Sequence, residues 1–242
     1  MSNTFVLVHG SWHGGWAWHC VSQELAQKGH RAYAPTLPGH SPGAIRRGIT
    51  HQDCVAAVVA EIEQHDLRSV VLVGHSFGGT VIQKVAERIP HRIKRTVFLD
   101  ALILCDNQSV VDILPPQFAA LTSNLASASS DNSMMIPWEA WRDNFMQDAP
   151  ELLARSIWEQ LSPEPHQVNV DKLDLKRFHS LAIPKAFIYC RQDQSMGDPE
   201  YFHPGMSSRL GSFKLLEMDG SHEVMFTQPE QLANKIIEAS SG

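Results

Sequence analysis

Cysteine is scarce in this chain. Four cysteines occur among 242 residues, and no two of them form a CxxC pair; they are Cys20, Cys54, Cys105 and Cys190. Such scatter is typical of neither a zinc cluster nor a disulfide framework. We therefore expect free thiols in a reducing compartment, which favours a cytoplasmic protein.

An excess of positive charge is also missing. Lysine and arginine together number 20 against 26 aspartates and glutamates, so the formal net charge is -6 with neutral histidines. Surfaces that bind nucleic acid need clustered lysines and arginines, and the densest basic patch, residues 92–95, is short. We expect no nucleic-acid partner.

Long hydrophobic runs are absent as well. The first run, residues 5–8, is too short for a secretory signal, and no run approaches the roughly 20 residues that cross a bilayer. We expect neither a signal segment nor a membrane contact. What the chain does have is a 43% hydrophobic composition, enough to bury a sizeable core in one α/β domain.

Short apolar runs alternate with helical patterns along most of the chain. The runs predict buried strands at residues 5–8, 32–34, 70–73, 96–99, 186–189 and 213–218. The patterns between them predict helices at residues 16–28, 51–65, 80–89 and 229–239. Such alternation indicates a mostly parallel central sheet flanked by helices on both faces.

One region, residues 106–179, interrupts the alternation before the last two strands. It carries a Pro-Pro pair, a stretch rich in serine and asparagine, and helical pieces with many large apolar side chains. A linker would have no reason to carry such side chains. We interpret residues 106–179 as a helical cap, or lid, and residues 1–105 with 180–242 as the core domain.

A candidate nucleophile lies where the third predicted strand ends. The sequence VVLVGHSFGG, residues 70–79, places Gly-x-Ser-x-Gly between that strand and a helix. In such a turn the serine backbone is strained and its hydroxyl is exposed, so Gly74 and Gly78 must be small. The helix dipole behind Ser76 favours developing negative charge. The pattern alone is common, but its context indicates a nucleophilic Ser76.

A serine nucleophile needs a base, and the base needs an acid that orients it. His222 follows the last predicted strand, where the base of this architecture is expected. Asp193 follows the preceding strand and gives the chain order Ser, Asp, His. Asp198 is a weaker candidate, and Asp100, directly after the fourth strand, is a second rival that could also reach the base.

The run HGSWHGGWAWH, residues 9–19, concentrates histidine, tryptophan and glycine after the first strand. His9 and His13 are four residues apart, as zinc ligands on a helix are, but the glycines argue against a helix and no nearby glutamate completes a protease motif. We instead expect a tight loop that supplies a backbone donor to an oxyanion. The two donors would be the amides of Ser11 and Phe77.

Together these motifs resemble the α/β-hydrolase superfamily, and more narrowly its branch of plant methyl esterases and hydroxynitrile lyases. The resemblance spans nearly the whole chain and is weakest over residues 106–179. It implies an α/β-hydrolase fold with Ser76, Asp193 and His222 as the triad. It also implies Ser11 and Phe77 as the oxyanion donors.

The lyase alternative is tested by two positions. Hydroxynitrile lyases of this branch have threonine at the position of Ser11 and lysine directly after the catalytic histidine, whereas this chain has Glu223 there. A carboxylate would repel departing cyanide. Ester hydrolysis needs no such lysine, so we favour a serine esterase over a lyase. A lactonase and a non-catalytic receptor on the same fold are further alternatives.

Large apolar side chains in residues 106–179 and beside the oxyanion loop favour a small, largely apolar ester. The candidate pocket residues are Trp12, Phe118, Trp138 and Trp141. No cluster of basic residues in the motifs indicates a phosphorylated or coenzyme A-linked substrate. We expect no metal and no organic cofactor, and the sequence leaves monomer and homodimer open.

Overall fold

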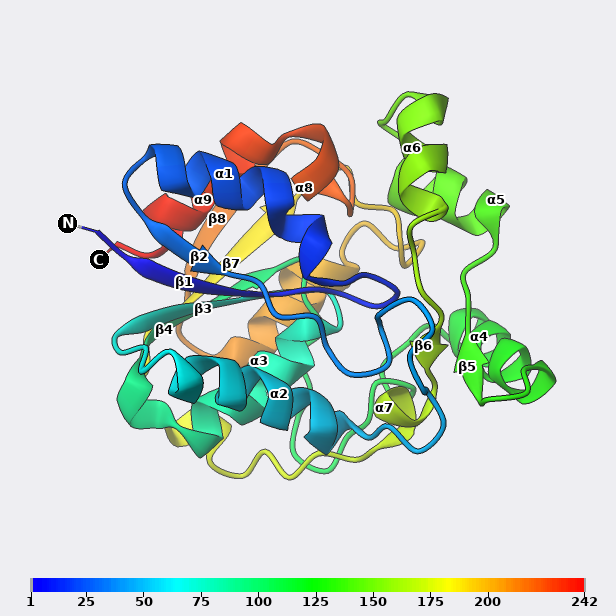
Figure 1. The fold of residues 1–242 in the computed structure, drawn as a ribbon, viewed down its shortest axis with the longest axis horizontal. Coiled ribbons are helices and arrows are strands. Elements are labelled where there is room, and N and C mark those ends of the chain that lie inside the picture. Colours follow the sequence, from blue (N-terminus) through cyan, green and yellow to red (C-terminus); the bar gives the residue numbers. More distant parts are fainter. Residues whose placement is uncertain (1, 242) are drawn as a thin grey trace.

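The computed structural model describes residues 2–241, which are built around a six-stranded parallel sheet (Figure 1). Its strands are β1 (Thr4–Val8), β2 (Arg31–Tyr33), β3 (Val70–His75), β4 (Ile93–Leu99), β7 (Lys185–Cys190) and β8 (Lys214–Met218). They lie in the order β2-β1-β3-β4-β7-β8. The expected parallel sheet is confirmed, although β4 begins at Ile93 rather than at residue 96.

Helices cover both faces of this sheet. Those outside the region between β4 and β7 are α1 (His19–Gln27), α2 (His51–Gln64), α3 (Gly78–Arg88), α8 (Val224–Thr227) and α9 (Pro229–Ala239). In Figure 1, α1 and α9 lie together on one face while α2 and α3 cover the other. The helix expected over residues 16–28 is divided, because a 3₁₀ turn, Gly15–Trp18, precedes α1.

Local sequence explains where α2 begins. Thr50 accepts a hydrogen bond from the backbone N–H of Asp53, and the Asp53 carboxylate accepts one from the backbone N–H of Thr50. This reciprocal cap satisfies two donors that would otherwise have no intrahelical partner. Helix α3 has no side-chain cap, because it starts directly from the turn that carries Ser76.

The alternation of side chains along the strands divides the core into two layers. Phe5 and Leu7 of β1 pack in the layer against α1 and α9, whereas Val6 and Val8 pack in the layer against α2 and α3. Successive side chains of a strand point to opposite faces, so a strand buried on both faces must be apolar throughout. Each such side chain stabilises the fold by about 1.5–3 kcal/mol through its burial.

Between β4 and β7 the chain leaves the sheet and forms a separate group of elements. They are α4 (Pro116–Ala128), β5 (Ser133–Met134), α5 (Trp138–Ala140), the π-helical segment Trp141–Phe145, α6 (Glu151–Trp158), β6 (Glu164–Pro165) and α7 (Gln167–Val170). A third hydrophobic cluster joins α4, β5, α5, the π-helical segment and α6, whereas Val168 of α7 packs in the layer against α2 and α3. We call residues 106–179 the cap. Strands β5 and β6 pair antiparallel, a feature that the sequence patterns did not predict.

Most of the cap, from α4 to β6, lies beyond the carboxyl edge of the sheet at the right of Figure 1, whereas α7 contacts α2 and the segment that follows it returns along the side of the molecule covered by α2 and α3. Parallel register brings the ends of the central strands to this edge, since Val8 pairs with Gly74 and His75 pairs with Leu99. The remaining 3₁₀ and π segments are Pro90–Arg92, Phe178–Ser180, Tyr201–Met206 and Ser207–Leu210. The segments after β3, β7 and β8 therefore meet beneath the cap.

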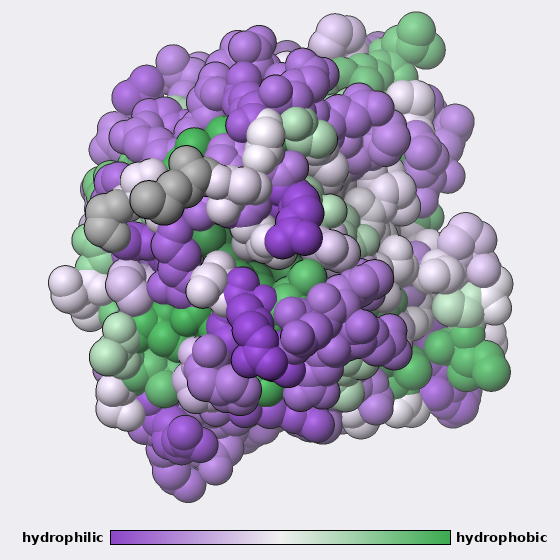
Figure 2. All heavy atoms as spheres, turned by 60° about the vertical axis from the view of Figure 1, so that its left-hand side comes forward, coloured by the Kyte–Doolittle hydropathy of each residue, from purple (hydrophilic) through white to green (hydrophobic). Residues whose placement is uncertain are grey.

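The outer surface is mainly polar on the face turned forward in Figure 2, where hydrophilic residues cover most of the area. Within residues 2–241, no helix combines the length and the apolar character needed to cross a bilayer. The four cysteines are free thiols, with Cys54 and Cys190 buried.

Candidate active site

Ser76 lies in a strained turn between β3 and α3. Its φ is +51°, in the left-handed region that non-glycine residues rarely adopt. The turn is fixed on both sides, because the Ser76 N–H donates to the Leu99 carbonyl and the Ser76 carbonyl accepts from the Leu102 N–H. Hydrogen bonds on both sides of a strained residue allow its unfavourable conformation to persist.

Three glycines make this turn possible. A Cβ on Gly74 would lie 2.6 Å from the Gly78 carbonyl oxygen, and one on Gly78 would lie 2.6 Å from that of Val8. The expectation that both positions must be small is therefore confirmed. A Cβ on Gly10 would lie 3.0 Å from the Cβ of Ser76, so the first loop also packs directly against the turn.

His222 and Asp193 come together on the loops after β8 and β7. The Nδ1 of His222 lies 2.6 Å from Oδ2 of Asp193, and both side chains are 1% exposed. The other carboxylate oxygen of Asp193 accepts from the backbone N–H of Ser195 at 2.8 Å. The hydroxyl of Ser195 also lies 3.3 Å from His222 Nδ1. Asp193 is thereby held in position and fixes the tautomer of His222.

The surroundings of His222 favour its charged form. Burial alone lowers the pKa of the imidazole, but the charge and hydrogen bond of Asp193 outweigh it, and Glu223 and Asp100 add to the effect. Together they raise the pKa of His222 to about 9. A neighbouring carboxylate stabilises an imidazolium in this way.

The position of the His222 ring is fixed by its neighbours. Phe202 stacks on the ring at 5.4 Å between centroids, and Phe145 meets it edge-on at 5.3 Å. His75, next to Ser76 in the chain, donates from Nε2 to the His222 carbonyl at 3.0 Å. In the described part of the chain, no hydrogen bond joins the Ser76 hydroxyl to the His222 ring. Catalytic hydrogen bonds are often long before substrate binds.

The two rival carboxylates have other partners. Asp100 is fully buried, and both of its oxygens face the N–H of Cys190 at 3.1 and 3.2 Å. Burial, and then the charge of Asp193, raise the pKa of Asp100 well above its usual range. Asp198 is exposed and accepts from the backbone N–H of Glu200. Of the three, Asp193 is the one hydrogen-bonded to His222.

The loop after β1 is tied to the cap through Trp12. Trp12 has a φ of +66°. Its N–H donates to Oε2 of Glu164 at 3.0 Å, and its carbonyl accepts from the N–H of Ser162 at 2.8 Å. Oε2 of Glu164 also accepts from Nε2 of His40 at 2.6 Å, and both of these side chains are fully buried. The backbone N–H groups of Ser11 and Phe77 have no hydrogen-bond partner within residues 2–241.

The histidines of this loop are occupied by local contacts. His9 donates from Nδ1 to the Gly10 carbonyl and accepts from the Leu37 N–H at Nε2, so neither ring nitrogen is free for a metal. His13 donates from Nδ1 to the Ser11 carbonyl at 2.7 Å. These contacts stabilise the backbone of the loop.

The other ring nitrogen of His13 faces Glu223. Its Nε2 lies 3.3 Å from Oε2 of Glu223, and both side chains are buried. Burial raises the pKa of Glu223 to about 8 and lowers that of His13 to about 3, so both are mostly neutral at pH 7. The expectation that an anionic Glu223 repels cyanide is therefore wrong at neutral pH, because the side chain is mostly uncharged there. The lysine typical of the lyases is nevertheless missing.

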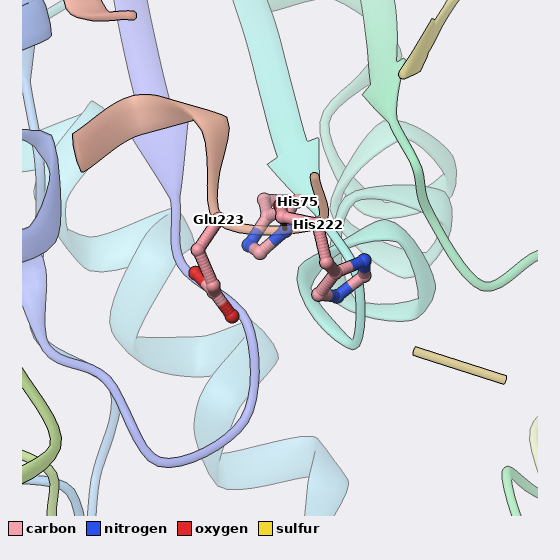
Figure 3. A group of neighbouring side chains, drawn as sticks. All are labelled: His75, His222 and Glu223. Carbon is pink, nitrogen blue, oxygen red and sulfur yellow. Dashed lines mark hydrogen bonds between the residues drawn. The ribbon is translucent and has the colours of Figure 1, made fainter. Parts of the chain in front are cut away.

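Two groups of buried side chains within residues 2–241 bring possible metal-ligand atoms within 4.8 Å of one another, and both include His222. One adds Asp100 and Asp193, and the other adds His75 and Glu223. In Figure 3 the ring of His222 and the carboxylate of Glu223 extend in different directions, with His75 between them in this view. One ring nitrogen of His222 is already hydrogen-bonded to Asp193, and one ring nitrogen of His75 is hydrogen-bonded to the His222 carbonyl. Neither group therefore presents a free set of ligands.

A narrow cavity of about 20 Å³ lies beside Ser76. It is lined by Ser11, Trp12, Ser76, Leu102, Val110, Leu114, Phe118, Thr122, Met134, Phe145, Asn169 and Met196. A neighbouring apolar hollow of about 10 Å³ shares Trp12, Phe118, Thr122 and Met134 with it. The lining is mainly apolar, which suits an apolar ligand.

Two of the four expected pocket residues line neither hollow. Trp12 and Phe118 do line the cavity. Trp141 is fully buried in the cap and donates from its indole to the Ala154 carbonyl, while Trp138 packs on Trp158. These two indoles lie in the cap's own hydrophobic cluster, which needs large side chains to form.

The sequence patterns missed Ser195, Glu164 and Asn169. Ser195 could have been noticed, because it lies two residues after Asp193 in the same loop. Glu164 and Asn169 have no local signal, since only the fold brings them to Trp12 and to the cavity.

Comparisons with known proteins cover the whole chain. A sequence model of the alpha/beta hydrolase family matches residues 5–235. An extracellular α/β-hydrolase from a Paenibacillus species, described as sharing structural and functional homology with tobacco salicylic acid binding protein 2, is 39% identical. It covers 98% of both chains with a TM-score of 0.94.

Two curated relatives also match over nearly their full lengths. The carbendazim hydrolyzing esterase of Nocardioides sp. (strain SG-4G) is 29% identical over 96% of this chain and 97% of its own. Methylesterase 1 of Arabidopsis thaliana is 28% identical over 97% of this chain and 94% of its own.

Proposed function

Because the chain belongs to the alpha/beta hydrolase family, we propose that it hydrolyses a small, largely apolar carboxylic ester, with Ser76, His222 and Asp193 as its triad. The chain is an esterase-type hydrolase, as its relatives named esterases and methylesterases indicate. The observation that carries the proposed mechanism is the 2.6 Å hydrogen bond between His222 and Asp193, beside the strained turn of Ser76.

The reaction proceeds in two steps. His222 takes the proton of the Ser76 hydroxyl as its oxygen attacks the ester carbonyl, and then gives that proton to the departing alcohol, which leaves an acyl-Ser76. In the second step His222 takes a proton from water, the resulting hydroxide attacks the acyl carbon, and Ser76 regains its proton as the acid leaves. Asp193 stabilises the imidazolium in both steps. Neither step needs a metal or an organic cofactor.

The oxyanion of each tetrahedral intermediate is bound by the backbone N–H groups of Ser11 and Phe77. Both residues adjoin Ser76, one across the close contact at Gly10 and the other along the chain. Neither N–H has a hydrogen-bond partner among the described residues, whereas the next amide, that of Trp12, donates to Glu164. Preorganised donors of this kind lower the barrier because they need no reorientation as charge develops.

Two substitutions at Ser11 test this role. Ser11→Ala keeps the N–H and should retain most activity, whereas Ser11→Pro removes it and should lower kcat by about 10²- to 10³-fold. The measurement is steady-state hydrolysis of an activated aryl ester, with thermal unfolding of both variants as the check on folding. Equal losses in the two variants would contradict a role for the amide.

The pH dependence of kcat/KM reports the free base. Only neutral His222 can accept the serine proton, and its pKa is raised to about 9. The rate should therefore climb by about tenfold per pH unit towards that value and level off above it. Glu223, whose pKa is raised to about 8, is mostly charged only in the upper part of this limb, where it favours the imidazolium. Glu223→Gln removes that charge, so it should move the upper part of the limb to lower pH. A profile that is flat between pH 5 and 8 would count against His222 as the base.

Three alternative functions remain to be compared. Cyanohydrin cleavage lacks support, because no lysine follows His222 and the side chain there, Glu223, faces His13. A receptor that only binds its ligand would not need His222 and Asp193 held in hydrogen-bonding contact. A lactone is a cyclic ester that the same mechanism would open, so a lactone is included among the substrates to be tested.

The division into a core, residues 1–105 and 180–242, and a cap, residues 106–179, forms part of this proposal. The cap supplies most of the apolar lining, including Phe118, Met134 and Phe145. The partner is a small-molecule ester, in keeping with the esterase relatives. A cytoplasmic location stays a prediction from the cysteine pattern, and the similar Paenibacillus protein is described as extracellular.

A further inference from the structure

The cavity beside Ser76 contains a polar group that catalysis does not use. Asn169, on α7, lines the cavity and is 2% exposed. Its Nδ2 has no hydrogen-bond partner in the described part of the chain. Buried amide groups in native proteins are nearly always hydrogen-bonded, so an unpartnered one in a ligand cavity indicates a polar group on the ligand.

The backbone holds Asn169 in place. Its N–H donates to the His166 carbonyl at 3.0 Å, and its own carbonyl accepts from the Val111 N–H at 3.1 Å. The side chain is therefore presented from a fixed position. A fixed donor contributes more to binding than one that must first be ordered.

A second residue of the lining also carries an unpartnered donor. Trp12 lines both the cavity and the adjoining hollow, and its buried Nε1 has no partner among the described residues. By contrast, the Thr122 hydroxyl, also in the lining, donates to the Ala119 carbonyl at 3.0 Å. Asn169 and Trp12 thus both line a mainly apolar space, and each carries an N–H group without a partner.

We propose that the substrate is an ester whose otherwise apolar acyl group carries a hydrogen-bond acceptor, such as a ketone oxygen, and that Asn169 binds this acceptor. This inference rests on the proposed esterase function and specifies its substrate. A purely apolar acyl group leaves the Asn169 N–H without a partner. An acceptor at the right position supplies the missing hydrogen bond, so it favours one ester over another of the same shape.

The experiment compares esters of matched shape. Methyl cyclohexanecarboxylate is the apolar member, and its 3-oxo and 4-oxo derivatives carry an acceptor at two positions of the ring. For the wild-type protein, we expect kcat/KM for at least one oxo ester to exceed that of the apolar ester by about tenfold. In Asn169→Leu, which keeps the branched shape of the side chain and removes the donor, the ratio should fall to about one.

The ratio is taken within each variant, so a general change in activity cancels. The matched control is Thr122→Val, which removes a polar atom from the same cavity whose hydrogen bond is already internal. It should keep the preference for the oxo ester. Loss of the preference in both variants would assign it to general packing and overturn the role of Asn169.

Failure of this inference is distinguishable from failure of the proposed function. Hydrolysis of all three esters at equal rates by the wild-type protein would overturn the inference and leave the esterase function intact. If no ester is hydrolysed, the proposed function fails for this class. Calorimetric titration of the same esters into the Ser76→Ala protein then decides the inference, since equal affinities for the oxo and apolar esters would overturn it.

Discussion

Ser76→Ala should lower ester hydrolysis by about 10⁴- to 10⁶-fold, the largest effect expected of any single change in this protein. The substitution removes the oxygen that attacks the carbonyl and leaves the oxyanion donors and the cavity in place. Alanine can follow the backbone of Ser76, because the hydrogen bonds that fix its φ of +51° are all made by peptide groups. Thermal unfolding should therefore change little.

The measurement uses a panel of methyl, alkyl and aryl esters, a lactone and a cyanohydrin, assayed on the wild-type protein and the variant. An independent readout is covalent: a fluorophosphonate should add to the wild-type protein at Ser76, as located by peptide mass spectrometry, and not to the variant. Ser208→Ala, at an exposed serine outside the cavity, is the matched control. Full ester turnover by Ser76→Ala, or cleavage of the cyanohydrin alone by the wild-type protein, would contradict the proposal.

Asp193→Asn should reduce kcat by about 10⁴-fold. An asparagine at this position can present an N–H to Nδ1 of His222, which would favour the tautomer that carries its proton on Nε2. That tautomer cannot accept the Ser76 proton. The loss of a negative charge would also lower the pKa of His222, whose main stabilising partner is Asp193. The rate and its pH profile should therefore change together.

Asp100→Asn is the matched comparison for that experiment. Both carboxylates are buried near His222, but Asp100 accepts from the Cys190 N–H, a bond that an asparagine oxygen can also accept. We expect the activity of this variant to stay within about tenfold of the wild type, since it loses a nearby charge but no hydrogen bond to His222. A loss in Asp100→Asn as deep as that in Asp193→Asn would assign the orienting role to Asp100.

Features with a short-range pattern could be predicted from the sequence. The six strands of the main sheet are compact apolar runs. The Gly-x-Ser-x-Gly motif is typical of a tight turn, so the sequence alone predicts that Gly74 and Gly78 must be small. The positions of His222 and Asp193 follow from chain order, because parallel strands deliver the segments that follow them to one edge. Chain order favours Asp193 over Asp100, and the hydrogen bond of Asp193 to His222 agrees with that preference.

Features that depend on the packing of the cap could not be predicted in this way. Trp138 and Trp141 were expected at the pocket because a large apolar side chain looks the same in sequence whether it touches a ligand or another helix. Glu164 lies 152 residues from Trp12 in the chain, and no periodicity relates the two. The unpartnered amide of Asn169 is visible only when all its neighbours are known.

The link between Trp12 and the cap constrains how substrate can enter. The N–H of Trp12 donates to Glu164 and its carbonyl accepts from Ser162, directly beside the Ser11 amide. A cap that swung away as one rigid piece would carry this loop with it and disrupt the proposed oxyanion site at every turnover. We therefore expect residues 162–164 to stay in place and the ester to enter past the part of the cap that precedes them, α4 to α6.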